Sequence, residues 1–408
     1  MKNYVIIGGG IASVGCIEGI RSVDKDSPIT LVGQENYDVY CRPLISYLLE
    51  GKTTVDKMKY RPDDFYDQND CKIVRATATG IDLESKTIAT DQGKIKYDEL
   101  CIATGSSPFV PPFAGLESVD KKFGFMTLDD ALALQSAVNK DSKVLIVGAG
   151  LIGLKCAEGL ADCVGKITVC DLADRVLSSI LDAECASMMQ KPLEEKGIEF
   201  LLGDSVKQFD SNTATMTSGK VVDFDVLVLA VGVRANVSLA KDAGIAVDRG
   251  IIADKNMRTS ASNVYTAGDC AQGYDCSIDG NRVLAILPSA YMQGYCAGVN
   301  MAGSSTQYDK DMPVNAIGFF GTHALTAGKY TGELYEERGE NSLKRLFFED
   351  NRLVGFMLIG DVKNAGIYTS LIREKTPLDT IDVELMKKTP CLSAFDKENR
   401  RKKLGGMV

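Results

Sequence analysis

The chain has 408 residues, of which 45% are hydrophobic, and this is enough apolar material for about two or three cores rather than one. The formal net charge of -9 at pH 7 provides no general positive field, which argues against nucleic acid or an anionic membrane surface as a partner. The sequence enters a strand pattern without a signal-peptide core, and it has no uncharged stretch long enough to span a membrane. We therefore expect a cytoplasmic protein whose partners are small molecules or another protein.

The sequence offers no framework for a metal site. It contains twelve cysteines, but they are scattered and none forms a Cys-x-x-Cys pair, and it contains one histidine. We expect no metal, and we expect most of the thiols to be buried side chains in a reducing cytosol.

Two segments begin with the same succession of a β-branched strand, a glycine turn, a helical run and a second strand. The first succession spans residues 4–32, and the second spans residues 143–170. Each is closed by a later strand that ends in a small-residue turn, at residues 100–105 and 226–232. The sequence therefore predicts an α/β fold with two Rossmann-like, nucleotide-binding domains.

The order of these segments predicts that the second domain is inserted in the first. Prolines and serines in residues 106–112 are typical of a linker, and residues 263–269 have the pattern of one more strand of the first domain. We expect the first domain to comprise residues 1–111 and 241–311, and the second to comprise residues 112–240.

The last part of the chain, residues 312–408, has a different pattern of alternating strands. Two strands meet at Asp350-Asn351, which predicts a hairpin turn, and a helix is expected near residues 364–374. We expect a small α+β C-terminal domain.

The glycine turn of the first unit reads Gly8-Gly9-Gly10-Ile11-Ala12-Ser13. Free N–H groups and the positive dipole end of the following helix suit a pyrophosphate, and glycine lets a phosphate approach the backbone. Ser13 stands where a third glycine usually permits close helix–strand packing, and it is small enough to be tolerated. We expect an acid after the second strand to bind a ribose. The expected cofactor-binding residues of this unit are Gly8, Gly10, Ile11, Ala12, Ser13 and Glu35.

The second glycine turn is complete, and Asp171 ends the strand about 20 residues further on. A carboxylate there binds the ribose 2′-hydroxyl and repels a 2′-phosphate, and no basic residue occupies the next two positions. These features favour NADH over NADPH. The expected cofactor-binding residues of this unit are Gly148, Gly150, Leu151, Ile152, Gly153 and Asp171.

A third motif, Thr266-Ala-Gly268-Asp269, indicates which unit holds a flavin. Asp269 follows a strand and a glycine turn, where it can accept a hydrogen bond from a ribityl hydroxyl. A helix then begins near Ser289, and its dipole would stabilise the reduced anionic flavin. We therefore expect FAD in the first domain. The remaining residues expected to bind cofactor are Ala78, Ala103, Thr104, Gly105, Gly232, Gly268, Asp269 and Ser289.

These motifs, in this order, resemble the pyridine nucleotide–disulfide oxidoreductase superfamily over essentially the whole chain. The further matches are Ala103-Thr104-Gly105-Ser-x-Pro108 and Ala230-x-Gly232-x-Arg-x-Asn236. The resemblance implies FAD on the first, discontinuous domain, NAD(P)H on the inserted domain, and a C-terminal interface domain that closes over the flavin.

Within the superfamily, Tyr40-Cys41-Arg42-Pro43-Leu44 looks like the Arg-Pro segment of rubredoxin, ferredoxin and nitrite-reductase-type flavoprotein reductases. The resemblance implies that Arg42 and Pro43 lie at FAD, with Arg42 near its phosphates. Our leading hypothesis is an FAD-dependent NADH oxidoreductase that passes electrons to a small rubredoxin-type or iron–sulfur carrier.

Two positions depart from these relatives. Tyr47 stands where a lysine commonly lies near flavin N5, and Lys155 stands where many relatives have a glutamate beside the nicotinamide. Lys155 either places a cation at the site of hydride transfer or forms a solvent-facing pair with Glu158, three residues further on.

Two alternative functions remain open. Cys41 falls where single-cysteine NADH oxidases, peroxidases and coenzyme A disulfide reductases keep a redox thiol, which would carry the electrons away as a pair. The chain could instead be an FAD- and NADH-binding subunit of a larger electron-transfer complex, with the charged tail of residues 396–406 as a docking segment. Its assembly could also be a homodimer, and its acceptor a small molecule.

Overall fold

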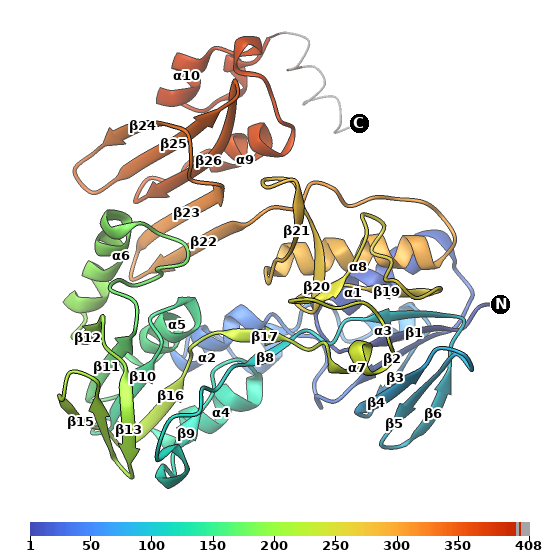
Figure 1. Cartoon of the computed structure of the whole chain (residues 1–408), viewed down its shortest axis with the longest axis horizontal. Helices are drawn as coiled ribbons and strands as arrows, with labels where there is room; N and C mark the ends of the chain where they lie inside the picture. Colours follow the sequence, from blue (N-terminus) through green and yellow to red (C-terminus); the bar gives the residue numbers. More distant parts are fainter. Residues whose placement is uncertain (397–399, 401–408) are drawn as a thin grey trace.

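The structure is a computed structural model that describes residues 1–396 and 400, so most of the charged tail of residues 396–406 lies outside the described residues. Figure 1 shows two α/β units side by side and a third unit, formed by the C-terminal part of the chain, next to the second. The expected class, an α/β fold with two Rossmann-like domains and a C-terminal α+β domain, is confirmed. No helix among the described residues has the length and apolar character needed to cross a membrane.

The first unit is built on a parallel sheet of five strands in the order β19-β7-β1-β2-β3. Its central strand is buried on both faces: Tyr4 and Ile6 point into one hydrophobic cluster, while Val5 and Ile7 point into another. The strands are β1 (Tyr4–Ile7), β2 (Ile29–Gly33), β3 (Cys71–Arg75), β7 (Glu99–Ile102) and β19 (Val264–Thr266).

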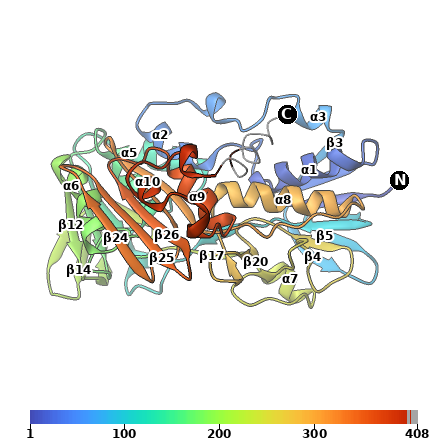
Figure 2. The ribbon, with the colours of Figure 1, turned by 90° about the horizontal axis from the view of Figure 1, so that it is seen from above.

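Two long helices, α1 (Ile11–Val23) and α8 (Leu287–Met301), run side by side on one face of this sheet (Figures 1 and 2). Their backbones touch because glycines line the contact. A Cβ at Gly15 would lie 2.1 Å from the carbonyl oxygen of Tyr291, and one at Gly294 would lie 2.0 Å from that of Ala12. The close contact fixes the N-terminal end of α8 relative to that of α1.

A smaller antiparallel sheet covers the other face, with Ile88 buried against Val5 and Leu100. Its strands are β4 (Ala78–Asp82), β5 (Thr87–Thr90) and β6 (Gly93–Lys96). The remaining elements of this unit are short: α2 (Ile45–Leu49), α3 (Phe65–Gln68), α7 (Ser238–Asp242), β18 (Ile251–Ile252), β20 (Ala271–Asp275) and β21 (Gly280–Val283).

The second unit repeats this plan with the strand order β12-β11-β10-β16-β9, all parallel. Its helices α4 (Leu128–Ala137), α5 (Leu151–Leu160) and α6 (Ala183–Glu195) pack in one cluster with the sheet, and a small antiparallel sheet covers the opposite face. The strands of the main sheet are β9 (Lys122–Phe123), β10 (Lys143–Val147), β11 (Lys166–Asp171), β12 (Ile198–Leu202) and β16 (Val226–Leu229); those of the small sheet are β13 (Val206–Asp210), β14 (Thr213–Met216) and β15 (Val221–Asp223).

The chain crosses between the two units along a pair of strands, β8 (Ser106–Pro108) and β17 (Val233–Ala235), which run antiparallel. The next helix already belongs to the first unit, because Ala240 packs in the cluster of Val5 and Leu100. We therefore propose that the return to the first domain takes place before the expected boundary at residue 240, directly after β17.

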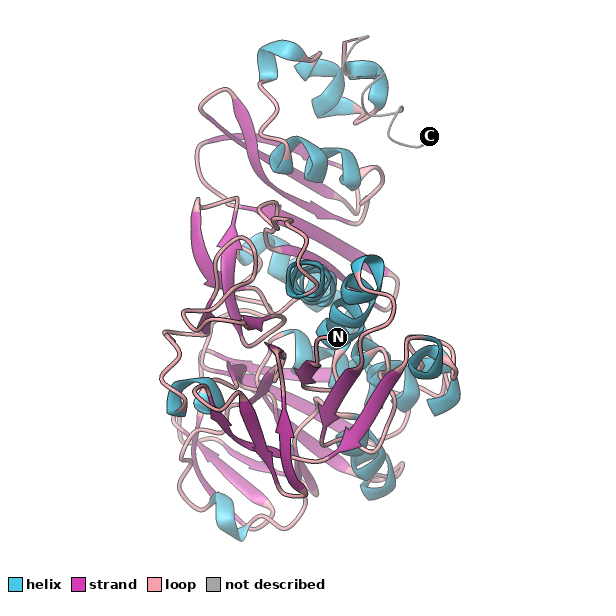
Figure 3. Ribbon diagram, turned by 90° about the vertical axis from the view of Figure 1, so that its right-hand side faces the viewer, coloured by secondary structure: helices cyan, strands magenta, loops and turns pink. Residues whose placement is uncertain are grey.

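The C-terminal unit is an antiparallel sheet in the order β22-β23-β26-β25-β24, with α9 (Ala365–Arg373) and α10 (Val383–Lys388) beside it (Figure 3). The hairpin turn and the helix expected in this region are confirmed: Asp350 and Asn351 both have positive φ between β25 and β26, and α9 lies within the expected range. The strands are β22 (Val314–Phe319), β23 (Thr322–Gly328), β24 (Glu333–Arg338), β25 (Leu343–Glu349) and β26 (Arg352–Ile359).

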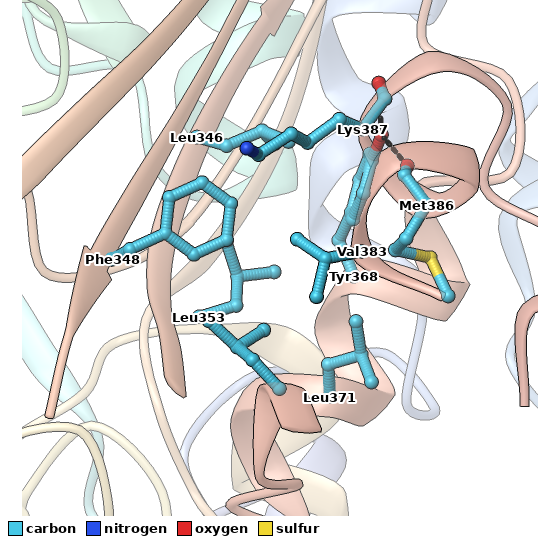
Figure 4. Close-up of a pocket in the computed structure, with 9 residues that line it drawn as sticks. Leu346, Phe348, Leu353, Tyr368, Leu371, Val383, Met386 and Lys387 are labelled. Carbon is cyan, nitrogen blue, oxygen red and sulfur yellow. Dashed lines mark hydrogen bonds between the residues drawn. The ribbon is translucent and has the colours of Figure 1, made fainter. Parts of the chain in front are cut away.

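The core of this unit contains a small apolar cavity between the sheet and its helices (Figure 4). Its volume of about 10 Å³ is close to that of one water position, so it holds no cofactor. Tyr368 closes one side, where its hydroxyl donates a hydrogen bond to the carbonyl oxygen of Met386 at 2.9 Å. The cavity is a packing feature at the contact between α9, α10 and the sheet.

Candidate functional site

The first glycine turn connects β1 to α1 and presents bare backbone. Gly8 has φ +118°, and a Cβ there would lie 2.0 Å from the carbonyl oxygen of Ala103, so no other residue fits. A Cβ at Gly9 or Gly10 would meet no heavy atom within 4 Å, which leaves this backbone open. The first turn of α1 has no acidic residue and no side-chain cap, so its N–H groups are available to an anion.

The second glycine turn, between β10 and α5, has the same geometry. Gly148 also has φ +118°, and a Cβ there would lie 2.2 Å from the carbonyl oxygen of Ala230. A Cβ at Gly153 would lie 2.0 Å from the carbonyl oxygen of Gly148, which explains the third glycine. In the first unit Ser13 occupies that position, where it is buried and donates to the carbonyl oxygen of Gly10 at 2.5 Å.

Asp171 lies at the second glycine turn. Its Oδ2 accepts a hydrogen bond from Ala149 N–H at 2.6 Å, and its Oδ1 accepts one from Ala173 N–H at 2.8 Å. Each carboxylate oxygen has a second lone pair for a ribose hydroxyl. The residues predicted from sequence for this nucleotide, Gly148 to Gly153 and Asp171, are thus brought together.

The first unit carries its acid in a different place. Strand register pairs Ile7 with Val32 and Val147 with Cys170, so Gly33 occupies the place of Asp171. Glu35 lies two residues further on, where it forms an ion pair with Arg42 and accepts a hydrogen bond from Tyr40 at 2.9 Å.

Arg42 interacts with two acidic residues, one near it in sequence and one far from it. It begins the short 3-10 helix η1 (Arg42–Leu44), in which Pro43 is exposed, and it pairs with Glu35. Burial raises the pKa of Asp269, while the hydroxyl of Ser106, 2.9 Å away, and the charge of Arg42 act in the opposite direction. Glu35, Arg42 and Asp269 therefore interact with one another through their charges.

The turn that carries Asp269 is held by two residues that the sequence reasoning missed. Gln293 on α8 accepts a hydrogen bond from Gly268 N–H at 2.9 Å and donates one to Asp311 at 3.1 Å. Asp311 is 1% exposed and also binds the hydroxyl of Ser289 at 2.5 Å. The Ser289 hydroxyl is therefore engaged within the protein, and the N–H groups at the start of α8 are the donors left for a ligand.

The remaining predicted residues lie around the two crossings of the chain. Thr104 donates to the carbonyl oxygen of Asn236 at 2.8 Å, and the Asn236 amide donates back to the Thr104 carbonyl oxygen at 2.9 Å. Gly105 and Gly232 have positive φ beside these contacts. Ala78 lies apart from them, at the start of β4, where it packs on the cluster beneath the first sheet.

Lys155 and Tyr47, the two departures from relatives, lie next to each other. The Lys155 ammonium is 5.8 Å from the centre of the Tyr47 ring and 2.6 Å from the Glu158 carboxylate. It also donates to the carbonyl oxygen of Gly318 on β22 at 2.6 Å. Lys155 is therefore paired with Glu158, but the pair is packed between α5 and the C-terminal sheet rather than facing solvent.

Cys41 lies directly before Arg42 and is partly buried. Burial raises the pKa of its thiol, whereas a reactive cysteine needs a lowered pKa. All twelve cysteines are free. Residues 1–396 and 400 contain no group of three or more His, Cys, Asp or Glu side chains that could hold a metal ion.

Two Rossmann-like units with matching glycine turns, one inserted in the other, define the class of proteins that hold two dinucleotides. A family model for pyridine nucleotide-disulphide oxidoreductases matches residues 2–294, and a model for the C-terminal domain of rubredoxin NAD⁺ reductase matches residues 314–376. The chain belongs to the pyridine nucleotide-disulphide oxidoreductase family. This confirms the resemblance, the class of enzyme and the expected cofactors, FAD and NADH.

Individual relatives cover most of the chain. The epsilon subunit of NADH-dependent phenylglyoxylate dehydrogenase from Aromatoleum evansii is 30% identical over 92% of this chain and 92% of its own length. The assimilatory nitrate reductase electron transfer subunit of Bacillus subtilis (strain 168) is 30% identical over 95% of this chain, which spans only 50% of that protein. A chain of the covalent putidaredoxin reductase–putidaredoxin complex shares the fold, with a TM-score of 0.87, 22% identity, and coverage of 100% of this chain and 98% of that chain.

Proposed function

We propose that this protein takes electrons from NADH onto FAD and delivers them to a small redox carrier such as rubredoxin or an iron–sulfur protein. The observation that carries the proposal is the pair of glycine turns with the same backbone geometry, on two sheets between which the chain crosses along β8 and β17. The acceptor class is supported by the C-terminal match to rubredoxin NAD⁺ reductase.

The residues fit FAD in the first unit. The open backbone of the first glycine turn and the N-terminus of α1 would hold the pyrophosphate with Arg42, since these groups offer N–H donors and a cation. Glu35 and Asp269, which both interact with the charge of Arg42, would accept hydrogen bonds from ribose and ribityl hydroxyls. When bound, FAD would accept a hydride and release single electrons.

The second unit would hold NADH in the same manner, with its pyrophosphate at Gly148–Gly153 and its ribose at Asp171. The C-terminal domain contacts α5 at Lys155 and Glu158, where it would limit the access of water to the bound nucleotide. The free N–H groups at the start of α8 would stabilise negative charge on the reduced flavin.

A second candidate is a subunit that performs the same transfer inside a larger complex. It is favoured by the Aromatoleum evansii relative, which is named as an epsilon subunit and matches along 92% of both chains. A homodimer is the third form of assembly we consider. We propose the cytoplasm as the location, because twelve unpaired thiols suit a reducing compartment.

The test is anaerobic reduction of the purified, FAD-loaded protein with NADH, followed by reoxidation with a set of acceptors. Rapid bleaching of the flavin and fast reoxidation by rubredoxin or a small iron–sulfur protein is the expected result. Reoxidation that requires a disulfide or peroxide, together with titration of one thiol, would assign the function to Cys41 instead. Bleaching without fast reoxidation by any single carrier would support the subunit.

A further inference from the structure

Tyr40 belongs to the first unit by sequence but packs in the second. It lies between β2 and η1, and the residue is 9% exposed. The ring is part of the hydrophobic cluster that includes Leu128 of α4 and Ile146 of β10. The segment that carries Glu35 and Arg42 is therefore anchored on the other domain.

The Tyr40 hydroxyl uses every hydrogen-bonding position it has. It donates to Glu35 Oε2 at 2.9 Å, and it accepts from Arg42 Nη1 at 3.2 Å and from Leu128 N–H at 2.9 Å. A phenol has one donor hydrogen and two lone pairs, so all three are satisfied. Burial raises the pKa of Tyr40, which keeps the hydroxyl protonated as a donor.

The Leu128 contact makes Tyr40 part of the cap of α4. Leu128 is the first residue of α4, and its N–H has no acceptor within the helix. Thr127 and Asp130 form a capping box that satisfies the neighbouring N–H groups, including that of Met126. Tyr40 therefore completes, from another domain, a cap that α4 does not complete alone.

Arg42 is bound to the same place on the second domain. Besides Tyr40 and Glu35, it donates to the carbonyl oxygen of Met126 at 3.2 Å, just before α4. The guanidinium thus has one set of partners in each domain. A shift of α4 relative to the first unit would move the Met126 carbonyl oxygen, which binds Arg42, and the Leu128 N–H, which binds Tyr40.

We propose that Tyr40 is a positioning residue that aims Arg42 and couples FAD binding to the orientation of the nucleotide domain inserted after it. This inference rests on the proposed function, because it takes Glu35 and Arg42 as FAD ligands. We expect bound FAD to strengthen dinucleotide binding to the second domain. Because coupling between two sites is reciprocal, the dinucleotide should strengthen FAD binding by the same factor. Without the Tyr40 hydroxyl, each site binds as if the other were empty.

The chain offers a matched control in Tyr37. Its hydroxyl donates to Asp129 at 2.6 Å, on the same first turn of α4, and its ring stacks edge-on against Tyr40 with the centroids 6.3 Å apart. In the part of the chain that the structure describes, the Tyr37 hydroxyl binds Asp129, whereas the Leu128 N–H and Arg42 bind the Tyr40 hydroxyl. Tyr37→Phe removes a hydroxyl between the same two domains and leaves the hydrogen bonds of Tyr40 and Arg42 in place.

The experiment measures FAD binding to the apoprotein by flavin fluorescence, and binding of ADP-ribose by calorimetry with and without FAD. ADP-ribose lacks the nicotinamide, so direct contact with the flavin does not contribute to the coupling. We expect Tyr40→Phe to weaken FAD about tenfold, because hydrogen bonds to charged groups are lost. FAD should raise the affinity of the unchanged protein for ADP-ribose and should not raise that of Tyr40→Phe, while Tyr37→Phe behaves as the unchanged protein.

A second measurement separates positioning from general damage. In an Arg42→Met background, which has already lost the aimed group, Tyr40→Phe should cause little further loss of FAD affinity. Equal losses in both backgrounds would overturn the proposal, as would Tyr40→Phe and Tyr37→Phe with the same coupling. If the unchanged protein binds no FAD, the proposed function fails; if it binds FAD and Tyr40→Phe leaves binding and coupling intact, only this inference fails.

Discussion

At the scale of single residues, the two nucleotide units share a backbone but differ in the acid that follows the second strand. In the second unit Asp171 is bound to the glycine turn itself through Ala149. In the first unit Gly33 takes that place, and Glu35 binds Arg42 instead. On the proposed assignment, the fixed carboxylate of Asp171 would face the position where a 2′-phosphate adds negative charge, and it would favour NADH.

Asp171→Ala should reduce the preference for NADH. Repulsion between a carboxylate and a 2′-phosphate at close range costs about 1 kcal/mol or more, so the ratio of kcat/KM for NADH over NADPH should fall about fivefold or more. Steady-state kinetics with both nucleotides measures this ratio. Asp174→Ala is the control, because that side chain is 79% exposed and pairs with Arg175. A lower KM for NADPH in the unchanged protein would contradict the assignment.

Cys41→Ser should leave NADH-to-dye electron transfer largely unchanged. The raised pKa of the thiol leaves little thiolate at neutral pH, and dye reduction requires only the flavin. Dye reduction and disulfide reduction are measured in parallel, with Cys163→Ser as a second partly buried thiol for comparison. Loss confined to disulfide or peroxide reduction in Cys41→Ser alone would move the function to the thiol.

At the scale of elements, local pattern was enough to predict the strand–glycine–helix units, the hairpin at Asp350-Asn351 and α9. Each depends on neighbours in sequence: a glycine with positive φ, a turn pair, a helical period. The packing of α1 on α8 was not predicted. Gly15 and Gly294 are needed because each lies against the backbone of the other helix, and the two helices are far apart in the chain. By local pattern alone, glycine within a helix only lowers helix propensity.

The residues of the candidate site are likewise of two kinds: some follow from local sequence, and others are brought together only by folding. The glycine turns and Asp171 follow from motif spacing, whereas Gln293 and Asp311 act through contacts that folding creates. No local pattern marks a buried aspartate as the partner of a glutamine 18 residues earlier. The contacts of Lys155 could not be predicted from the sequence for the same reason, because its acceptor Gly318 belongs to another domain.

Lys155→Glu tests the contact between α5 and the C-terminal sheet. Glutamate there would face Glu158 and the Gly318 carbonyl oxygen, so the thermal midpoint should fall. On the proposed function, exchange of a cation for an anion near the flavin also disfavours the reduced anion, and the flavin potential should fall by about 30 mV or more. Calorimetry and an equilibrium dye titration measure the two effects.

Lys155→Met separates these effects, because it keeps most of the length of the side chain but removes the charge. It should lower the flavin potential by less than Lys155→Glu does, with FAD content unchanged in both variants. A potential that is the same in all three proteins would show that Lys155 serves only to attach the C-terminal sheet to α5.

At the scale of the whole molecule, the C-terminal domain is held on the second unit by a charged network at α6. Arg345 on β25 is 12% exposed and contacts Asp182, the N-cap of α6, and Glu184 on its first turn, as well as Glu336 on the neighbouring strand β24. Hydrogen bonding from Arg345 lowers the pKa of Glu336, and that from Arg338 lowers the pKa of Glu184. Because these charges add to the apolar contact between the domains, we expect the attachment of this domain to depend on pH.

The sign of that sensitivity follows from the lowered pKa values. A carboxylate with a lower pKa in the folded state contributes stability above its unfolded pKa, and this contribution is lost as the pH falls through the folded value. Because ordinary carboxyl pKa values are about 4, attachment of the C-terminal domain should be complete at neutral pH and weaken below about pH 4.

Arg345→Met should loosen the C-terminal domain at neutral pH. The variant keeps much of the buried stem but leaves Asp182 without its cation and leaves Glu184 and Glu336 with Arg338 alone, which costs about 1–2 kcal/mol for a partly buried network. Calorimetry should resolve an earlier transition for this domain, and that transition should depend less on acid than in the unchanged protein. Lys191→Met is the control, because its pair with Glu195 on the same helix is exposed and 3.9 Å long. A single, unshifted transition in Arg345→Met would show that apolar packing alone fixes the domain.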